Sequence, residues 1–531
     1  MTPVDAVEAL MVGDAWSPAL LADLDERDAF PAGAVDSLDA AGLQAHYVLT
    51  PDSDFHEMVS LVRAVARRDL TVAIAHGKTF LGSAAVWVAG TPAQCDRLAD
   101  RVRAGEPVCL ALTERNHGAD LLAGELAATA LDTGWRLDGE KWLINNAARA
   151  GLACVLARTD PAGGGRGFSF FLVDRRRLHS TAWETLPKVR THGIRGADIS
   201  GFVLHGAEVG EDALVGAVGD GLTVALKALQ LTRIACVALS LGAADHALRL
   251  ARDFVTTREL YGRALAEVPH VRRILGRAAA RALAAEAVST VAARSVRALP
   301  GELSVTSAIA KAFVPAVVGE LLSELAELLG ARGFLTSPPG VGFAKLERDH
   351  RVCGIFDGST VVNRVALAGQ LPRLGRLLGK GLSAPGLAAA VDLGTETPPF
   401  DRSRLALVSA TGSSLVQALP AAVKRLPAAI APLADALTAR LAALEAELAG
   451  FVPVAGGLPS SAFDLAERYE RTYAAAACVL LWQANHHRDH TWLRACLAVL
   501  LDEPDDAAFE AMAQVLLTWS GQAFSLPGAG A

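Results

Sequence analysis

Apolar residues recur at helical spacing over residues 304–329, and this pattern constrains the fold more than any other feature of the chain. The stripe consists of Val314, Val317, Leu321, Leu325 and Leu328. Residues three and four apart share one face of a helix, so the stripe predicts a long helix with a buried side. Gly330 should end it, and Pro315 should kink it or divide it in two. Segments 232–261 and 269–296 repeat the pattern, which predicts a helical bundle.

Two different patterns precede this bundle. Residues 1–107 read as helical; for example, apolar side chains of the segment 55–70 lie at helical spacing. From Cys109 to about Val215 the chain changes to short β-rich runs, of which 152–156 and 168–173 are predicted strands. Asp138-Gly139 is a favoured pair for a tight turn and predicts a hairpin over residues 135–142. The expected fold class is therefore mainly α with a central β domain.

The last part of the chain is again helical. A stretch rich in helix breakers, residues 394–401 with Pro398-Pro399, reads as a linker, and helices are expected near 462–487 and 507–519. We therefore divide the chain into four predicted domains. They are an N-terminal helical domain (1–107), a middle β domain (108–217), a helical bundle (218–375) and a helical extension (376–531).

Charge and cysteine content exclude several function classes. The net charge is −7, which gives no basic surface for a nucleic-acid partner. The seven cysteines are scattered without metal-ligand spacing, which is typical of a reducing cytosol. No signal peptide is recognisable at the N-terminus, and the longest apolar runs look too short to cross a bilayer. We expect a cytoplasmic protein without a metal or an integral membrane segment.

Two local clusters allow a functional and a structural interpretation. The segment 163–167, Gly-Gly-Gly-Arg-Gly, could be a phosphate loop or a flexible hairpin loop; it lacks the lysine of a phosphate loop, which favours the hairpin. No GxGxxG follows a predicted strand, so a dinucleotide-binding Rossmann fold is not expected. The segment 486–490, His-His-Arg-Asp-His, could hold a metal or form a solvated helix end. Adjacent histidines on a helix diverge, which favours the helix end.

Four motifs in a fixed order give the strongest indication of function. They are Ala111–Asp120 (ALTERNHGAD), Gly139–Asn146 (GEKWLINN), Thr257–Gly262 (TRELYG) and Arg348–Thr360 (RDHRVCGIFDGST). In sequence and in order they resemble the motifs of the acyl-CoA dehydrogenase family, over residues about 20–375. The resemblance implies an N-terminal helical domain, a β-barrel-like middle domain and a C-terminal four-helix bundle. The helical tail after residue 375 matches the extra domain of some longer relatives in position only.

The resemblance also implies a reaction. Members of the family remove hydrogens from the α and β carbons of an acyl thioester, with FAD as the hydride acceptor. Their base is the carboxylate of the last motif, here Asp357, and the N–H of this residue helps to hold the thioester oxygen, beside Gly358. Asp replaces the usual Glu, which withdraws the carboxylate by roughly 1.5 Å. The structural alternative is that Asp357 caps the turn before Gly358.

By the same resemblance, the first two motifs would contact the flavin ring. The implied contacts are Leu112, Thr113, Gly118, Ala119, Leu143 and Asn145. Three of these positions differ from the family pattern: Ala119 replaces Ser, Leu143 stands where Trp is usual, and Asn145 replaces Thr. The structural alternative is ordinary turn and strand packing.

The third and fourth motifs would contact the rest of the cofactor and the substrate. Arg258, with Tyr261, would bind the pyrophosphate or adenine end of FAD across a subunit boundary, because a guanidinium forks onto phosphate oxygens. Ser359 keeps a hydroxyl near the flavin, and Arg233 lies at the substrate end of the bundle. For both arginines the alternative is a surface position on a helix. Three positions that usually carry Gln and help to hold FAD are changed here: Pro269, Glu327 and Val361.

Three functional hypotheses follow. The first is an FAD-dependent dehydrogenase of acyl-CoA or acyl-carrier-protein thioesters in lipid or secondary metabolism, with electron-transfer flavoprotein as a possible partner. The second is an acyl-CoA oxidase or flavin monooxygenase on the same fold. The third is a non-catalytic subunit with a degenerate flavin site. A homodimer or homotetramer is expected by resemblance, and the tail could serve a dimer contact, a carrier protein or a membrane surface.

Overall fold

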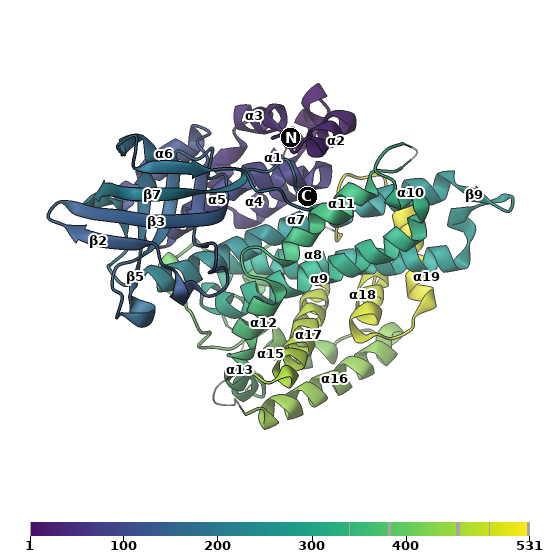
Figure 1. The fold of residues 1–531 in the computed structure, drawn as a ribbon. Coiled ribbons are helices and arrows are strands. Elements are labelled where there is room, and N and C mark those ends of the chain that lie inside the picture. Colours follow the sequence, from purple (N-terminus) through teal and green to yellow (C-terminus); the bar gives the residue numbers. More distant parts are fainter. Residues whose placement is uncertain (1, 339, 381–383, 453–456, 488, 528–531) are drawn as a thin grey trace. The chain divides into compact units, whose positions relative to one another are not determined.

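The chain folds into two compact units. The computed structural model describes residues 2–338, 340–380, 384–452, 457–487 and 489–527 (Figure 1). Unit 1 comprises residues 1–54 and 68–232, and unit 2 comprises residues 55–67 and 233–531. Helix α4 (Phe55–Arg68) therefore belongs almost entirely to unit 2, although the segments on either side of it belong to unit 1.

Unit 1 begins with helices whose ends are set by the local sequence. They are α1 (Pro3–Leu10), α2 (Pro18–Glu26), α3 (Ala32–Ala40), α5 (Leu70–Ala89) and α6 (Pro92–Arg103). Asp69 caps α5, because its side chain accepts a hydrogen bond from the N–H of Val72. Thr91 and Gln94 form a capping box at the start of α6.

The strands of unit 1 form one eight-stranded sheet in the order β6-β7-β3-β2-β4-β5-β8, with β1 parallel to β4. They are β1 (Val108–Ala111), β2 (Ala127–Leu131), β3 (Gly134–Asn145), β4 (Leu152–Arg158), β5 (Phe168–Asp174), β6 (Trp183–Leu186), β7 (Ile199–Gly210) and β8 (Leu214–Val215). Figure 1 shows the long strands β3 and β7 side by side. Leu137, Phe171 and Phe202 are fully buried in the core of this sheet. The predicted strands 152–156 and 168–173 are confirmed, and the glycine-rich segment 163–167 lies in the hairpin loop between them.

The predicted hairpin over residues 135–142 is wrong. These residues lie in the single strand β3, and the turn before it is at residues 132–133. Asp138-Gly139 instead marks an irregularity in the pairing of β3 with β7. The Asp138 carboxylate accepts the N–H of Gly206, and Gly139 has a φ of +136°. A residue pair that suits a turn also suits a β-bulge, because both need unusual backbone angles.

Unit 2 is helical, apart from a small hairpin of β9 (Glu259–Leu260) and β10 (Arg263–Ala264). Its long helices are α7 (Gly221–Thr257, in unit 2 from Arg233), α8 (Pro269–Ala298) and α9 (Leu303–Leu329). Helices α10 (Ala331–Phe334), α11 (Phe343–His350), α12 (Thr360–Ala368) and α13 (Leu371–Leu378) follow. The three predicted long helices are confirmed, although α7 starts earlier and ends at the hairpin. Pro315 does not divide α9, which ends at Gly330 with a φ of +55°.

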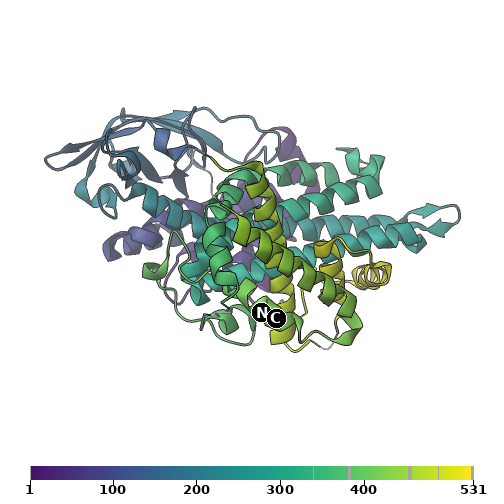
Figure 2. The same ribbon diagram turned by 90° about the horizontal axis from the view of Figure 1, so that it is seen from below.

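The tail packs against this bundle. It contains α14 (Leu387–Val391), α15 (Ser414–Val423), α16 (Ala431–Gly450), α17 (Ser460–Ala484), α18 (Thr491–Leu501) and α19 (Asp506–Thr518). Helices α17, α18 and α19 all contact α8 (Figure 2). A Cβ at Gly276 of α8 would lie 1.9 Å from the carbonyl oxygen of Phe509, so only glycine allows α19 to approach so closely. The predicted linker has no regular structure, but Arg297 of α8 donates to the carbonyl oxygen of Pro398, 2.7 Å away.

Three helical stretches, Leu70–Ala89, Gly221–Thr257 and Pro300–Leu329, are long and apolar enough to cross a membrane by length and composition. A bent pair, Ser414–Val423 with Ala428–Gly450, passes the same test together. The expectation that no apolar stretch is long enough is therefore wrong. In the three single helices 83, 72 and 83% of the apolar window is buried inside the protein, so core packing accounts for their composition.

Candidate active site

Asp357 lies in a turn of unit 2 in which two consecutive residues have positive φ angles. The turn connects residues 351–354 to α12, and Asp357 and Gly358 have φ values of +56° and +91°. A Cβ at Gly358 would lie 3.2 Å from Nη2 of Arg233 and would also be strained by its φ. Gly358 therefore lets the guanidinium of Arg233 come close to the turn.

Arg233 of α7 supports the backbone of this turn. Its Nε donates a hydrogen bond to the carbonyl oxygen of Asp357, 3.3 Å away. The side chain is buried, and burial lowers the pKa of Arg233 to about 10, although the negative charge of Asp357 opposes the shift. Arg233 therefore remains a cation at neutral pH. The alternative of a surface position is therefore excluded for Arg233.

The carboxylate of Asp357 is half-buried and has a hydrogen-bond donor from α7. The Sγ of Cys236 lies 2.7 Å from Oδ2 of Asp357. Cys236 is buried and lies one helical turn from Arg233, so both side chains reach the same turn. No sequence pattern indicated this pairing, because 121 residues separate the two.

Lys311 of α9 stabilises the same turn through hydrogen bonds to its backbone. Its Nζ donates to the carbonyl oxygens of Cys353 (2.7 Å) and Gly358 (3.2 Å), and lies 5.1 Å from the ring centre of Phe356. The side chain is fully buried. We did not predict this residue, although one lysine within the apolar core of a predicted helix was an available signal, since buried lysines need polar partners.

Two further side chains fix the start of α12. The hydroxyl of Ser359 accepts the N–H of Val362 at 3.3 Å, and Asn363 donates to the carbonyl oxygens of Gly358 and Ser359. Ser359 is thus the N-cap of α12. Its predicted contact with a cofactor stays a prediction, and the structure adds a capping function.

A partly buried ion pair precedes the turn. Asp349 is buried, and its carboxylate lies 3.6 Å from Nη2 of Arg348 and 2.8 Å from Nζ of Lys345. Asp349 therefore pairs with both cations, and Lys345 is the nearer one. Next to it, burial and the charge of Lys311 lower the pKa of His350 to about 4, so this imidazole is neutral at pH 7.

Arg258 lines a cavity elsewhere in unit 2. The cavity has a volume of about 570 Å³ and is formed by the end of α7, the start of α8 and the end of α9. Arg258, His270, Glu327 and Arg332 supply its polar lining. Arg258 is exposed and lines the same cavity as Glu327, and its contact with FAD stays a prediction. Tyr261 is fully exposed at the tip of the β9–β10 hairpin and is not part of the lining.

The first two motifs are connected by hydrogen bonds within unit 1. The hydroxyl of Thr113 donates to the carbonyl oxygen of Trp142 at 2.7 Å, and the N–H of Trp142 donates back to Thr113 at 3.1 Å. Lys141 is buried, and its Nζ donates to Glu114 (2.8 Å) and to the carbonyl oxygen of Leu112 (3.1 Å). Burial alone would raise the pKa of Glu114, but Lys141 and two backbone N–H groups hold it below its ordinary value. This pair was not predicted, although both residues lie in the motifs.

Leu143 and Asn145 lie at the C-terminal end of β3. The pairing with β7 shifts between Trp142 and Ile144, and Leu143 has a φ of +56° and a 45% exposed side chain. The buried Oδ1 of Asn145 has no hydrogen-bond partner within the described part of the chain. Gly118 and Ala119 of the neighbouring motif are exposed. An exposed apolar side chain and an unsatisfied amide oxygen fit the face and polar edge of a flavin ring.

Two regions of the chain match domains of a known family. Residues 109–207 match the acyl-CoA dehydrogenase middle domain, and residues 219–371 match the acyl-CoA dehydrogenase C-terminal domain. The chain belongs to the acyl-CoA dehydrogenase family. Its homologues are oxidoreductases that act on a CH–CH bond, and the chain is an enzyme of this class.

Individual relatives support the assignment. A probable acyl-CoA dehydrogenase of Mycobacterium bovis is 28% identical over 360 residues, which cover 66% of this chain and 90% of the relative. Butyryl-CoA dehydrogenase from Megasphaera elsdenii has a TM-score of 0.64 at 24% identity and covers 70% of this chain and 98% of its own. An acyl-CoA dehydrogenase from Bacillus anthracis, complexed with FAD, has a TM-score of 0.70 at 19% identity. That likeness covers 97% of this chain and 86% of the relative, so the fold of the tail is shared as well.

The metal interpretation of residues 486–490 gains no support. Within the ranges that the structure describes, which leave out Arg488, no group of three His, Cys, Asp or Glu residues could hold a metal ion. Helix α17 ends before this segment, and His487 packs against the ring of Trp492 with a 6.0 Å centroid distance.

Proposed function

We propose that the enzyme is an FAD-dependent dehydrogenase that forms a double bond between the α and β carbons of an acyl thioester. The carboxylate of Asp357 is the observation that carries this proposal. It is half-buried, and its turn is held by two buried cations, Arg233 and Lys311. A carboxylate that is held in place and only partly hydrated can act as a general base.

The chain's own residues would perform three tasks. Asp357 takes the proton from the α carbon, and its backbone N–H donates to the thioester carbonyl oxygen, where negative charge develops. Arg233 and Lys311 hold the backbone of the turn, so that the carboxylate keeps one position during the reaction. Bound FAD would supply the hydride acceptor for the β hydrogen.

Two groups of residues would hold FAD. Leu143 and Asn145, together with Leu112, Thr113, Gly118 and Ala119 of the first motif, would contact the flavin ring. Arg258 would bind phosphate oxygens, and its cavity also contains Arg332 and His270. Glu327 brings a negative charge to that cavity, so we expect weaker binding of the diphosphate than a glutamine at this position would give.

Substrate and partners are proposals of the same kind. The thioester is acyl-CoA or an acyl-carrier protein, within lipid or secondary metabolism. The proposed electron acceptor is an electron-transfer flavoprotein, and the proposed state is a cytoplasmic homodimer or homotetramer.

A flavin spectrum and one variant test the proposal. The purified enzyme, titrated without oxygen with butyryl-, octanoyl- and phenylpropionyl-CoA, should lose its oxidised flavin absorption with at least one thioester. Asp357→Asn should bind flavin equally but should not be bleached, whereas Asp401→Asn, an exposed carboxylate of the same unit, should behave as the wild type. Full bleaching of Asp357→Asn would contradict the mechanism, and protein without flavin after incubation with FAD would favour the non-catalytic subunit.

An oxygen-using reaction is the second candidate. The exposed Leu143 and the unsatisfied Asn145 alter the surroundings of the flavin ring relative to the family pattern. One structural neighbour, a prolyl acyl carrier protein oxidase, shares the fold with a TM-score of 0.62 at 18% identity. Turnover with an artificial electron acceptor in the absence of oxygen would support the dehydrogenase, and turnover that requires oxygen would support the oxidase.

A further inference from the structure

The base at position 357 is one methylene shorter than the glutamate of the family pattern, and a cysteine side chain contacts it. We propose that Cys236 is a positioning residue, whose thiol holds the carboxylate of Asp357 in the orientation needed for α-proton abstraction. This inference rests on the proposed function, because it assumes that Asp357 is the base.

The geometry gives the thiol a direct effect on the carboxylate. The Sγ of Cys236 lies 2.7 Å from Oδ2 of Asp357, whereas Arg233 reaches the backbone carbonyl of the same residue. A thiol is a weak donor, but a bond to an ionised oxygen is shorter and stronger than one to a neutral group. Arg233 thus fixes the main chain of the turn, and Cys236 fixes the direction of the carboxylate plane.

The ordinary alternative is that Cys236 is a small apolar side chain that fills space. Buried cysteines commonly have this function, and their thiols then donate to backbone carbonyls. Cys496 is an example, because its Sγ lies 3.3 Å from the carbonyl oxygen of Ala280. Cys236 differs because its partner is the carboxylate that the proposed reaction uses.

A short base makes orientation more important. An aspartate has fewer side-chain torsions than a glutamate and reaches less far from the backbone, so a rotation of its carboxylate is not easily compensated. A misplacement of about 1 Å can lower a rate by on the order of a hundredfold. A donor that selects one carboxylate orientation would therefore act on the chemical step, and less on the affinity for the substrate.

Two variants of Cys236 separate the positioning function from packing. Cys236→Ala removes the donor, and Cys236→Ser keeps a donor of similar size. Cys236→Ala should lower kcat by about tenfold or more with KM within about twofold. Cys236→Ser should recover most of the lost rate, and Cys478→Ala, a buried cysteine of the tail, should leave the rate unchanged.

Proton exchange supplies a readout that needs no hydride transfer. Phenylacetyl-CoA has acidic α hydrogens and no β hydrogen, so the base alone can exchange its α hydrogens with D₂O, as followed by NMR. The wild type should exchange them, Cys236→Ala should exchange them at least several-fold more slowly, and Asp357→Asn should not exchange them. In an Asp357→Glu background, Cys236→Ala should have a smaller effect, because the contact that it removes belongs to the shorter side chain.

The outcomes distinguish failure of this inference from failure of the proposed function. If the wild type exchanges protons or turns over and Cys236→Ala does so at the same rate, Cys236 only fills space. If Cys236→Ala and Cys236→Ser are equally slow and equally destabilised, packing explains the loss and the inference is overturned. If the wild type does not exchange α protons and no thioester bleaches its flavin, the proposed function is wrong. The inference about Cys236 is then wrong as well, because it depends on that function.

Discussion

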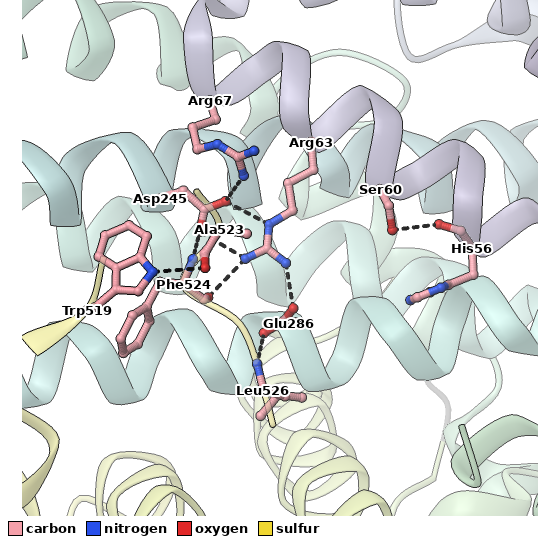
Figure 3. A network of polar contacts seen from close by, with 10 residues as sticks. All are labelled: His56, Ser60, Arg63, Arg67, Asp245, Glu286, Trp519, Ala523, Phe524 and Leu526. Atoms are coloured by element: carbon pink, nitrogen blue, oxygen red, sulfur yellow. Dashed lines mark hydrogen bonds and ion pairs between the residues drawn. The ribbon is translucent and has the colours of Figure 1, made fainter. Parts of the chain in front are cut away.

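The guanidinium of Arg63 on α4 binds both carboxylate oxygens of Asp245 on α7, through Nε at 2.8 Å and Nη2 at 2.9 Å (Figure 3). Its Nη1 binds Glu286 of α8 at 2.5 Å, and Nη2 also reaches the carbonyl oxygen of Phe524. All three charged side chains are buried. Burial opposes the charged form of each group, so the cluster is stable only while its partners are complete.

Arg63→Met should destabilise unit 2 strongly. It leaves Asp245 and Glu286 buried with less compensation, which typically costs about 3–5 kcal/mol. Unfolding in urea, followed by circular dichroism, measures the change. Arg27→Met is the matched control, because Arg27 forms an exposed pair with Asp23 and should cost less than about 1 kcal/mol. A cost for Arg63→Met as small as that of the control would show that the cluster adds little.

Removal of residues 523–531 should have a comparable effect. The N–H of Phe524 donates to Asp245 at 3.1 Å, and the N–H of Leu526 donates to Glu286 at 2.7 Å. The side chains of Phe524 and Leu526 are buried, and each would lose about 1.5–3 kcal/mol of burial free energy. Removal of residues 528–531 alone keeps these contacts and serves as the control. Equal melting temperatures of the two shortened chains would contradict the prediction.

Lys311→Met should loosen the turn that carries Asp357. The carbonyl oxygens of Cys353 and Gly358 lose a buried charged donor, so we expect a loss of about 1–3 kcal/mol in stability. The rate should also fall, on the order of tenfold to a hundredfold in kcat/KM, because the base is less well placed. Steady-state kinetics and flavin absorption test this together. Unchanged kcat/KM in a folded, flavin-containing variant would separate Lys311 from the reaction.

Acid should destabilise the fold through His350. Burial lowers its pKa to about 4 in the folded chain from an ordinary 6.5, so the unfolded chain binds a proton at a pH at which the folded chain does not. Stability is therefore lost as the pH falls from about 6.5 to about 4, by on the order of 3 kcal/mol in total. Denaturation of the wild type and of His350→Gln at several pH values gives the difference that His350 causes.

The comparison with His350→Gln is needed because the buried carboxyl group of Glu470 changes the stability with pH in the opposite direction. Burial raises the pKa of Glu470 to about 7 from an ordinary 4.5. The folded chain binds that proton more readily, so this group favours folding as the pH falls through this interval. A pH dependence that is the same with and without His350 would contradict the prediction.

The buried pair of Glu114 and Lys141 should be coupled. Either Glu114→Gln or Lys141→Met leaves one buried group without its partner, and each should cost about 3–5 kcal/mol. The double variant should cost clearly less than the sum of the two, because the second change then removes an uncompensated charge. Denaturant unfolding of all four chains measures this coupling. Additive costs would mean that the two motifs are held together by their backbone contacts alone.

Helices that depend on local residue spacing could be predicted from the sequence. Contacts between residues far apart in the chain could mostly not be predicted. The long helices α8 and α9 follow from spacing, Pro269 and Gly330. Asp138-Gly139 misled because a bulge and a turn need similar backbone angles. Asp357 and Arg233 could be singled out because the family resemblance marks both positions, and the structure brings them into contact. Cys236 could not, because nothing in a sequence shows that a residue on α7 contacts one 121 positions later.

Helix α4 has a consequence for how the chain is made. It is synthesised 461 positions before Phe524, whose carbonyl oxygen accepts a hydrogen bond from its Arg63. A ribosome that adds about 5–20 residues per second needs on the order of half a minute or more to supply that partner. During this time the apolar face of α4 and its arginines lack their native neighbours. Protection of the growing chain by a chaperone should therefore matter most for this helix in the interval before Phe524 is made.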